Sequence, residues 1–288
     1  MKSKHDIIII GGGPAGIACA VQLKRYGLSP LMIEKQNYPG GLIANANLIE
    51  NYPGFPNGIS GQAFIKLLEK HIVNFDVNIL NEEILNVDYN KNFIINTSSQ
   101  TLESKLLVVA SGTKSLEYDK TKIEPEAQQL IFTEIVPIIN SKNKTIAIFG
   151  SGDAAFDYAL NLAKNNKVMI INRTNRTKCL KSLYESAHEN NNIDYIENDN
   201  YSNISCKNSG LLISTVQNKS IEVDYVIFGI GRQPNLTFLS ESFLSIQDIL
   251  LNENKLFYIG DVCSGKYRQA SIAVADGIRT AMIIKELF

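Results

Sequence analysis

Two stretches of the chain repeat the same order of apolar and polar positions. In each, a short β-branched run leads into closely spaced glycines, then an amphipathic segment, and then a second short apolar run. The stretches cover residues 7–34 and 146–173. Short apolar runs of this kind are typical of buried parallel strands, and an amphipathic segment predicts a helix. The chain therefore contains two strand–turn–helix–strand units, which form a long-range internal repeat.

The first unit has the glycine spacing of a dinucleotide-binding turn. Gly11, Gly13 and Gly16 form GxGxxG, and Glu34 follows the second predicted strand. Gly11 permits the tight turn, Gly13 lets the backbone approach a pyrophosphate, and Gly16 lets helix and strand pack closely. Glu34 can accept hydrogen bonds from ribose hydroxyls. A lone GxGxxG also fits an ordinary strand–turn–helix, but the flanking strand, helix and acid favour dinucleotide binding.

The second unit ends in bases instead of an acid. Gly150, Gly152 and Ala155 form GxGxxA, and the sequence Asn-Arg-Thr-Asn-Arg-Thr-Lys at 172–178 follows the second strand. A carboxylate at the ribose position would repel a 2′-phosphate, whereas arginine and lysine attract one. We expect this unit to bind NADPH in preference to NADH, although a solvated basic loop could have the same sequence. The contrast between the two units suggests FAD in the first and NADPH in the second.

The segments between the repeats complete an α/β fold. Residues 77–110 and 193–231 consist of short apolar runs and polar turns, which predict strand meanders, and polar proline-containing segments predict two crossings between domains. The predicted architecture is two Rossmann-like dinucleotide-binding domains of the three-layer ββα type. The NAD(P)H-binding domain, residues 114–235, is inserted into an FAD-binding domain made of residues 1–113 and 236–288.

Composition narrows the possible partners. The chain has 288 residues, is 44% hydrophobic and 20% charged, and carries a net charge of −1. This balance indicates no nucleic-acid or membrane-surface footprint. No apolar run reaches the ~18 residues of a membrane span, and the N-terminal run is too short for a signal peptide, so we expect a cytoplasmic protein. The three histidines are isolated from one another, so no metal site is expected.

Eight motifs, in order and over essentially the whole chain, make it resemble the low-molecular-weight, thioredoxin-reductase-like flavoproteins. They are GGGPAG at 11–16, PGGL at 39–42, IENYPGFP at 49–56, VVASG at 108–112, GSGDAA at 150–155, GIGRQPN at 229–235, IGDV at 259–262 and YRQA at 267–270. The resemblance implies FAD in the outer domain, NADPH in the inserted one, hydride transfer from NADPH to flavin, and a homodimer.

The motifs carry the candidate site residues. For FAD these are Gly11, Gly13, Pro14, Ala15, Gly16, Glu34, Lys35, Gly40, Gly41, Leu42, Asn51, Ala110, Ser111, Gly112, Gly260, Asp261, Arg268, Gln269 and Ala270. For NADPH they are Gly150, Gly152, Asp153, Ala154, Ala155, Arg173, Thr174, Lys178 and Gly231. Asp261 can hydrogen-bond the ribityl or pyrophosphate region, or alternatively cap a short turn. By resemblance, the helix that begins near Ala270 directs its positive end at the flavin ring.

The resemblance also implies a CxxC dithiol in the inserted domain. An ungapped alignment from Gly150 places it on Phe132, Thr133, Glu134 and Ile135, and the chain's cysteines are Cys19, Cys179, Cys206 and Cys263. None of these lies between residues 20 and 178, so no dithiol is expected there. Glu134 is interpreted as a solvated acid or, alternatively, as an acid that faces the flavin when the domains rotate. Some relatives use a single cysteine in the first glycine-rich turn, but Ala15 lies in that turn here and Cys19 is expected to be buried.

The predicted function is an FAD-dependent NAD(P)H oxidoreductase that passes electrons from NADPH through flavin to a non-dithiol acceptor. A redox protein such as ferredoxin or flavodoxin is the expected partner. Two alternatives remain open: a disulfide reductase of the thioredoxin reductase type that uses distant cysteines, and a non-enzymatic or regulatory flavoprotein with a vestigial nucleotide site. Thr174 departs from the paired arginines of NADPH-using relatives, so NADH remains an alternative coenzyme.

Overall fold

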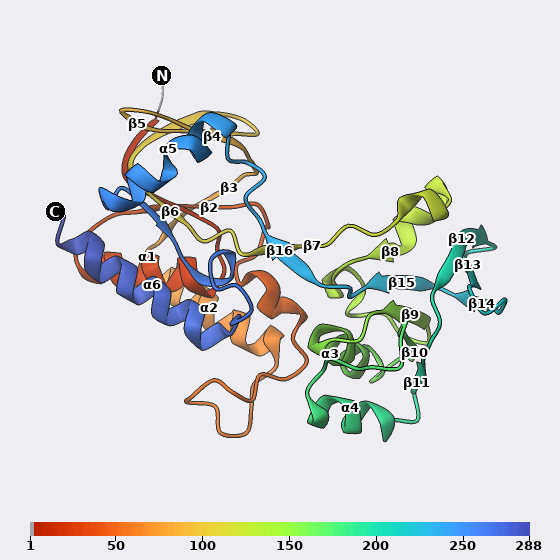
Figure 1. Cartoon of the computed structure of the whole chain (residues 1–288). Coiled ribbons are helices and arrows are strands. Elements are labelled where there is room, and N and C mark those ends of the chain that lie inside the picture. Colours follow the sequence, from red (N-terminus) through yellow and green to blue (C-terminus); the bar gives the residue numbers. More distant parts are fainter. Residues whose placement is uncertain (1–2) are drawn as a thin grey trace. The chain divides into compact units, whose positions relative to one another are not determined.

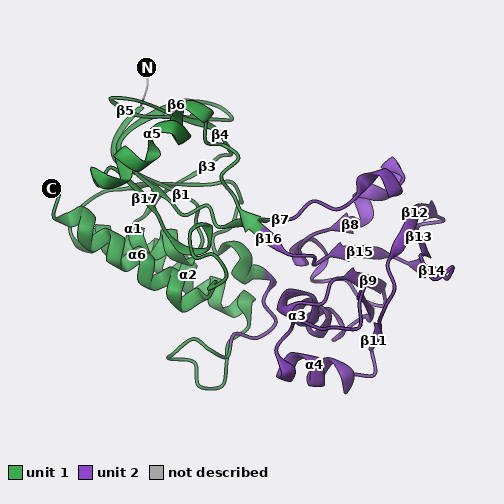
Figure 2. Ribbon diagram, viewed as in Figure 1, with its two compact units in different colours: residues 1–44, 50–114, 233–288 green, residues 45–49, 115–232 purple. Residues whose placement is uncertain are grey.

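A computed structural model describes residues 3–288, which divide into two compact units (Figures 1 and 2). Unit 1 contains the chain up to residue 44 together with residues 50–114 and 233–288. Unit 2 contains residues 45–49 and 115–232. These divisions lie within three residues of the boundaries predicted from sequence. The segment 45–49 differs from the prediction, because it groups with unit 2 although its neighbours on both sides belong to unit 1.

Unit 1 is built on a seven-stranded sheet in the order β3-β2-β1-β6-β5-β4, with β17 beside β6. The strands are β1 (Ser3–Ile10), β2 (Leu31–Glu34), β3 (Asn78–Asn81), β4 (Ile84–Asn90), β5 (Asn92–Thr97), β6 (Thr101–Val109) and β17 (Leu256–Tyr258). Strands β3, β2, β1, β6 and β17 pair with one another in parallel. Strands β4 and β5 are antiparallel to each other, and β5 is antiparallel to β6.

Helices pack on this sheet through apolar faces. They are α1 (Pro14–Arg25), α2 (Gly61–Asn74), α5 (Glu241–Asn252) and α6 (Ala270–Lys285), with the 3₁₀ turns η1 (Gly41–Asn45) and η5 (Gly260–Val262). Helix α1 begins at a proline, whose fixed φ and missing N–H suit the first turn. Gly277 lets α6 pack closely on α1, because a Cβ there would clash with the carbonyl of Ala15. The buried core includes Ile8, Phe93 and Phe243.

Unit 2 contains a five-stranded parallel sheet in the order β11-β10-β9-β15-β8 and a three-stranded antiparallel sheet. The parallel strands are β8 (Ile131–Phe132), β9 (Thr145–Phe149), β10 (Lys167–Ile171), β11 (Ile193–Ile196) and β15 (Tyr225–Phe228), and the antiparallel ones are β12 (Tyr201–Lys207), β13 (Gly210–Thr215) and β14 (Ser220–Val223). The helices are α3 (Asp153–Leu162) and α4 (Lys181–His188), with the 3₁₀ turns η2 (Lys120–Lys122), η3 (Pro125–Leu130) and η4 (Val136–Ile138). The two chain crossings carry β7 (Thr113–Ser115) and β16 (Arg232–Pro234), which form a two-stranded sheet.

The α/β class with two Rossmann-like domains is confirmed, but the predicted meanders include strands that pair in parallel. Strand β3 pairs in parallel with β2, and β11 pairs in parallel with β10. Each of these strands follows a helix, α2 or α4, and a crossover helix returns the chain parallel to the preceding strand. Strand β15, at the end of the second predicted meander, also pairs in parallel, with β8 and β9.

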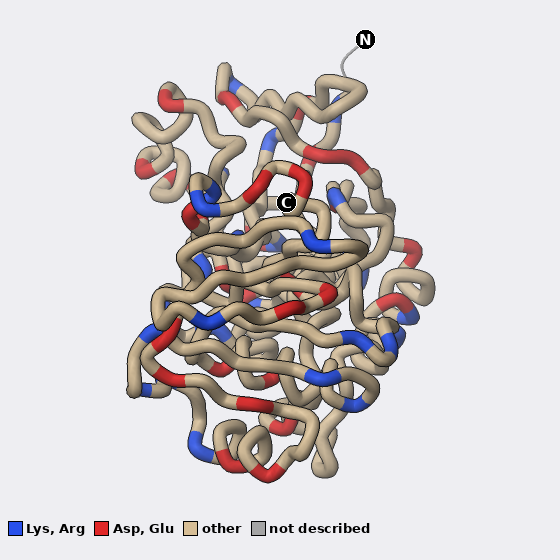
Figure 3. The backbone as a smooth tube through the Cα atoms, turned by 90° about the vertical axis from the view of Figure 1, so that its right-hand side faces the viewer, with Lys and Arg blue, Asp and Glu red and all other residues tan. Residues whose placement is uncertain are grey.

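Charged residues of both signs occur throughout the described part of the chain. Figure 3 shows acidic and basic residues interspersed along the strands and loops on the side that faces the viewer. Among residues 3–288, no helix combines the length and apolar character that crossing a membrane would require.

Candidate cofactor and coenzyme sites

The glycines of the first glycine-rich turn, in unit 1, have different structural roles. Gly11 has a φ of +103°, and a Cβ there would clash with the carbonyl of Ala110. A Cβ on Gly16 would clash with the carbonyl of Gly11. By contrast, a Cβ on Gly13 would have no atom within 4 Å. Gly11 and Gly16 are thus required by the fold itself, whereas Gly13 leaves open space above the start of α1.

A second pair of glycines lies against this turn. The Gly40 amide donates to the Gly12 carbonyl over 2.7 Å. A Cβ on Gly41 would lie 3.5 Å from the Cα of Gly13. The PGGL motif and the GGGPAG motif therefore form one backbone cradle, and its approach to a pyrophosphate stays a prediction.

Glu34 lies at the rim of the cradle, at the end of β2. Its Oε2 accepts a hydrogen bond from the Gly12 amide over 2.6 Å, and its Oε1 accepts one from the Gln36 amide over 2.8 Å. The side chain is buried, with 9% of the residue exposed. Lys35 points elsewhere and forms an exposed 2.6 Å ion pair with Glu83. The structure therefore brings Glu34 to the turn and leaves the candidate Lys35 at the surface.

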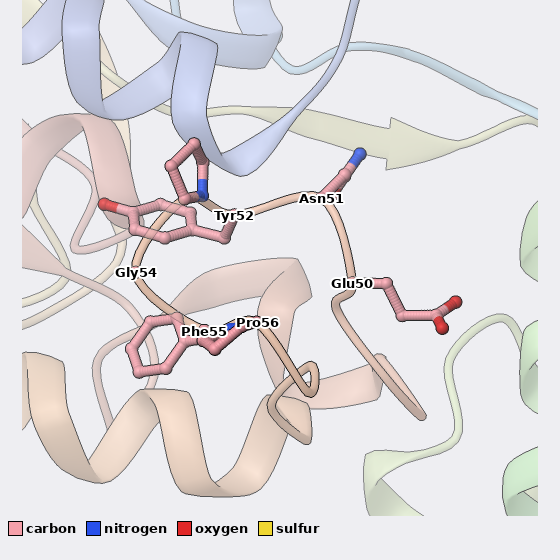
Figure 4. Close-up of a pocket in the computed structure, with 7 residues that line it drawn as sticks. Glu50, Asn51, Tyr52, Gly54, Phe55 and Pro56 are labelled. Atoms are coloured by element: carbon pink, nitrogen blue, oxygen red, sulfur yellow. The ribbon is translucent and has the colours of Figure 1, made fainter.

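The loop at residues 50–56 connects the remaining FAD candidates. Asn51 donates through Nδ2 to the Oε1 of Gln269 over 2.8 Å, which joins the loop to the start of α6. Figure 4 shows Tyr52 and Phe55 on the opposite side of the loop from Asn51. Tyr52 packs on Phe64 of α2 with ring centroids 4.9 Å apart. The loop is thus held from both sides, and it lines an open recess of about 390 Å³.

The GD motif lies close to the same helix start. Gly260 has a φ of +72°, and a Cβ there would lie 2.8 Å from the Cβ of Ala15. Its amide donates to Asp276 Oδ2 over 3.2 Å. Asp261 lies inside η5, which Ile259 precedes as its cap. The alternative interpretation of Asp261 as an N-cap is therefore wrong.

These residues of unit 1 fit FAD. The cradle combines two glycine-rich turns, open space at Gly13, the N-terminus of α1 and a carboxylate where a ribose would lie. Ser111 and Gly112 are tied to the returning chain, because Ser111 Oγ donates to the Asn235 carbonyl over 2.7 Å and the Asn235 amide donates to the Gly112 carbonyl over 3.0 Å. The individual FAD contacts stay predictions.

Unit 2 contains a larger pocket, of about 720 Å³, beside its own glycine-rich turn. Eight of the nine residues predicted to bind NADPH line it: Gly150, Gly152, Asp153, Ala154, Arg173, Thr174, Lys178 and Gly231. The ninth, Ala155, is fully buried beneath the turn, where its methyl faces Gly229. The sequence repeat thus located this pocket, and Ala155 supports its floor.

Sequence reasoning missed several side chains that line the same pocket. Tyr118 stacks on Phe228 with ring centroids 4.2 Å apart, and both line the pocket. Tyr158 and Arg232 line it from α3 and β16. Arg232 lies inside the GIGRQPN motif, so the motif contained the signal. The aromatic residues lie outside every motif and give no such signal.

The place predicted for a dithiol holds a polar cluster instead. Glu134 Oε1 lies 3.0 Å from the Arg232 guanidinium, and its Oε2 accepts from Asn45 Nδ2 over 3.3 Å. Asn45 in turn accepts the backbone amides of Ile135 and Val136 through Oδ1 over 2.9 and 3.1 Å. Glu134 is therefore ion-paired and only 31% exposed, so its interpretation as a solvated acid is wrong. Asn45 was missed because it lies far away in sequence and belongs to no motif.

A second carboxylate lies on α3, next to Tyr158. Asp157 accepts the backbone amide of Asn47 through Oδ2 over 2.9 Å. Burial raises the pKa of Asp157 to about 6, partly offset by hydrogen bonds from the amides of Asn47 and Leu48. Burial also raises the pKa of Tyr158 to about 12. Asp157 is therefore a group that changes charge near neutral pH.

All four cysteines lie among residues 3–288 and are free. Cys19 is fully buried in α1, and burial raises the pKa of its thiol to about 12. Burial also raises the pKa of Cys179 and of Cys263, whose thiol donates to the carbonyls of Tyr258 and Gly260. Cys206 is exposed on β12 of unit 2. Three of the four thiols are thus disfavoured as thiolates, the reactive form.

Comparison with known proteins identifies the family of the chain. The family model described as pyridine nucleotide-disulphide oxidoreductase matches residues 5–277, so the chain belongs to this family. The thioredoxin reductase of Ureaplasma parvum serovar 3 is 28% identical over 299 residues, covering 98% of this chain and 96% of that protein. The prediction of a thioredoxin-reductase-like flavoprotein with FAD and NADPH is therefore confirmed.

Several solved structures have the same fold as this chain. The thioredoxin reductase of T. acidophilum superposes with a TM-score of 0.82 at 24% identity, covering 99% of each chain. The bacillithiol disulfide reductase of Bacillus cereus superposes with a TM-score of 0.75 at 18% identity, covering 99% of this chain and all of that one. The chain is thus an FAD-dependent pyridine nucleotide oxidoreductase, and its electron acceptor is the remaining question.

Proposed function

We propose that the protein is an NADPH-dependent FAD oxidoreductase that reduces an external acceptor without a dithiol relay of its own. Bound FAD would supply the two-electron chemistry that accepts hydride from NADPH and the ability to release electrons to an acceptor. The chain's own residues hold the cofactor in the cradle of unit 1 and the coenzyme in the pocket of unit 2. The cytoplasmic location and the homodimer expected from the resemblance are part of this proposal.

The proposal rests on the burial and the pKa values of the cysteine thiols. A dithiol relay needs two thiols whose Cα atoms approach within ~7 Å, and at least one with a lowered pKa. Cys19 is buried in the core of unit 1, and the pKa values of Cys179 and Cys263 are raised. Glu134 and Arg232 form an ion pair where the resemblance puts the dithiol. These features support a non-dithiol acceptor, such as ferredoxin or flavodoxin, whereas none of the comparisons supports that partner.

The comparisons favour the alternative, a disulfide reductase. The relatives are named thioredoxin reductases, and one structural neighbour is named for a low-molecular-weight disulfide. An oxidised thioredoxin or a small disulfide is therefore the strongest competing acceptor. Either would have to be reduced through Cys179, Cys206 or Cys263, the thiols outside the core.

One experiment tests the reductase function itself. Anaerobic stopped-flow mixing of the holoprotein with NADPH should bleach the visible flavin absorbance, and mixing with NADH should bleach it more slowly. If neither coenzyme bleaches the flavin, the protein is a non-enzymatic or regulatory flavoprotein and the proposal fails.

A second experiment distinguishes the acceptors. The NADPH-reduced protein is mixed with ferredoxin, flavodoxin, oxidised thioredoxin, a small disulfide, a quinone or dioxygen, and flavin reoxidation is followed. The same series is repeated for the Cys179→Ser, Cys206→Ser and Cys263→Ser variants. Reoxidation by a non-disulfide acceptor at unchanged rates in all three variants supports the proposal. Fast reoxidation by a disulfide that collapses in any of the three variants establishes the alternative.

A further inference from the structure

Asn172 of unit 2 occupies the position that Glu34 holds in unit 1. The register of the backbone establishes this correspondence. The Gly11 amide donates to the Ile33 carbonyl over 2.8 Å, and the Gly150 amide donates to the Ile171 carbonyl over 3.2 Å. In each unit the next residue lies where the strand that the first glycine contacts comes to its end: Glu34 is the last residue of β2, and Asn172 directly follows β10. One unit therefore has a carboxylate at this position and the other has a neutral amide.

The two side chains make different contacts. The Glu34 carboxylate accepts the Gly12 amide and lies against the glycine-rich turn. The Asn172 side chain is bonded into the loop that follows it. Its Nδ2 donates to the carbonyl of Arg176 over 3.0 Å and to the Tyr195 hydroxyl over 2.9 Å. Its Oδ1 accepts the Thr174 amide over 3.2 Å. Asn172 is 2% exposed, so these bonds are shielded from water.

The loop that Asn172 organises is the basic segment 173–178. Its far end is tied to the glycine-rich turn, because the Lys178 amide donates to the Ser151 carbonyl over 2.8 Å. Arg173 and Lys178 line the coenzyme pocket from this loop. The loop is therefore fixed at its end by the turn and in its middle by Asn172.

We propose that Asn172 is a positioning residue that determines coenzyme specificity by folding the basic loop for a 2′-phosphate. It would do so in two ways. It removes the carboxylate that would repel the phosphate, and its bonds to Thr174 and Arg176 set the backbone that carries Arg173 and Lys178. This inference rests on the proposed NADPH-dependent function. It adds that Asn172 acts indirectly, through the backbone that positions the basic side chains.

The test uses two nucleotide fragments that differ only in the 2′-phosphate. Binding of 2′,5′-ADP and of 5′-AMP to the holoprotein is measured by calorimetry for the wild type, Asn172→Ala and Asn172→Asp. Because charge-assisted hydrogen bonds to a phosphate depend on fixed geometry, both variants should bind 2′,5′-ADP about tenfold or more weakly. Affinity for 5′-AMP should stay within about twofold, since the glycine-rich turn is retained.

Asn166 provides a matched control at the opposite end of β10. It is also buried, at 5% exposed, and it also organises neighbouring backbone, donating to the carbonyls of Ser141 and Leu162 and accepting the Lys144 amide. Asn166→Ala should lower thermal stability but leave the ratio of the two affinities unchanged. If Asn172→Ala does not fold, Tyr195→Phe removes one hydrogen-bond partner of Asn172 and should lower the same ratio by a smaller factor.

The outcomes separate this inference from the proposed function. A wild-type protein that binds both fragments equally overturns the NADPH assignment and the inference with it. A wild-type preference for 2′,5′-ADP that survives in the Asn172 variants overturns only the role of Asn172. An equal loss of affinity for both fragments also overturns it, because Asn172 would then support the whole pocket and not the phosphate.

Discussion

The Glu134 carboxylate and the Arg232 guanidinium lie 3.0 Å apart, and Arg232 lines the pocket of about 720 Å³ in unit 2. Both side chains are largely removed from water, with 31% and 17% of their surfaces exposed. Asn45 donates to the second carboxylate oxygen and so fixes the orientation of Glu134. The pair therefore differs from an exposed ion pair, in which solvent and side-chain freedom cancel most of the attraction.

A double-mutant cycle with Glu134→Gln and Arg232→Gln should yield a coupling energy of about 1–2 kcal/mol in denaturant unfolding. The physical reason is partial burial, which weakens the competition of water for both charges. The exposed pair Lys181–Glu185 on α4, with 88% and 56% exposed side chains, is the control and should couple by less than about 0.5 kcal/mol. Equal coupling in the two cycles would contradict the assigned role of burial.

Asp157 should make stability depend on pH. Burial raises the pKa of Asp157 from its ordinary 3.8 to about 6. The folded state thus holds this proton more tightly than the unfolded state, so the associated stability is present below about pH 4 and is lost as the pH rises through 6. Asp157→Asn removes this dependence. From pH 4 to pH 7, the unfolding free energy of wild type should fall relative to the variant by at most roughly 3 kcal/mol.

One outcome would contradict this prediction. If the unfolding free energies of the wild type and of Asp157→Asn change in parallel between pH 4 and pH 7, the buried carboxylate is not the source of the pH dependence.

Two glycine substitutions should separate folding from flavin retention. Gly13→Ala adds a methyl group into open space, so the fold should form with a melting temperature within about 2 °C of wild type. The methyl group would nevertheless occupy the space of the pyrophosphate, so the purified variant should lack visible flavin absorbance. Gly16→Ala directs a methyl group into the Gly11 carbonyl and should fail to fold or melt far lower. A yellow Gly13→Ala protein would disprove the placement of the pyrophosphate.

The thiols should differ sharply in reactivity. Cys206 is exposed, whereas Cys19 is fully buried and has a pKa of about 12. A thiol-disulfide reagent at neutral pH should therefore modify Cys206 rapidly and Cys19 only after unfolding, because the thiolate must be present and accessible. Mass mapping of the labelled peptides reads out the order, and Cys206→Ser should remove the fast phase. Labelling of Cys19 in the native protein would show that α1 opens readily.

Sequence patterns predicted the structural features that depend on residues close together in the sequence. The two glycine-rich turns, Glu34 and the basic segment each depend on neighbouring residues and a repeated spacing, so they could be recognised before the structure was known. Eight of the nine predicted NADPH residues line one pocket for this reason. The parallel pairing of β3 and β11 could not be read from their apolar runs, because a strand pattern does not state its partner.

Sequence patterns also failed to predict polar contacts between residues that are far apart in the sequence. Glu134 was interpreted as solvated because its sequence neighbours offer no partner, yet its partners lie 89 and 98 residues away at Asn45 and Arg232. Tyr118 and Phe228 likewise meet only through the fold. Spacing within a motif carries information about the backbone of a turn, but it carries none about which distant side chain completes a charge pair.

The contact between Ala155 and Gly229 restricts how this protein can change over generations. A methyl group added at Gly229 would lie 3.3 Å from the Ala155 methyl, and Gly150 leaves no room on the other side because its own space is filled by the Gly229 carbonyl. A separation of 3.3 Å is tighter than ordinary van der Waals contact, so an alanine at 229 would require its neighbours to shift by a few tenths of an ångström. A smaller side chain at one of these two positions therefore eases a larger one at the other, and the two positions are expected to vary together when homologous sequences are compared.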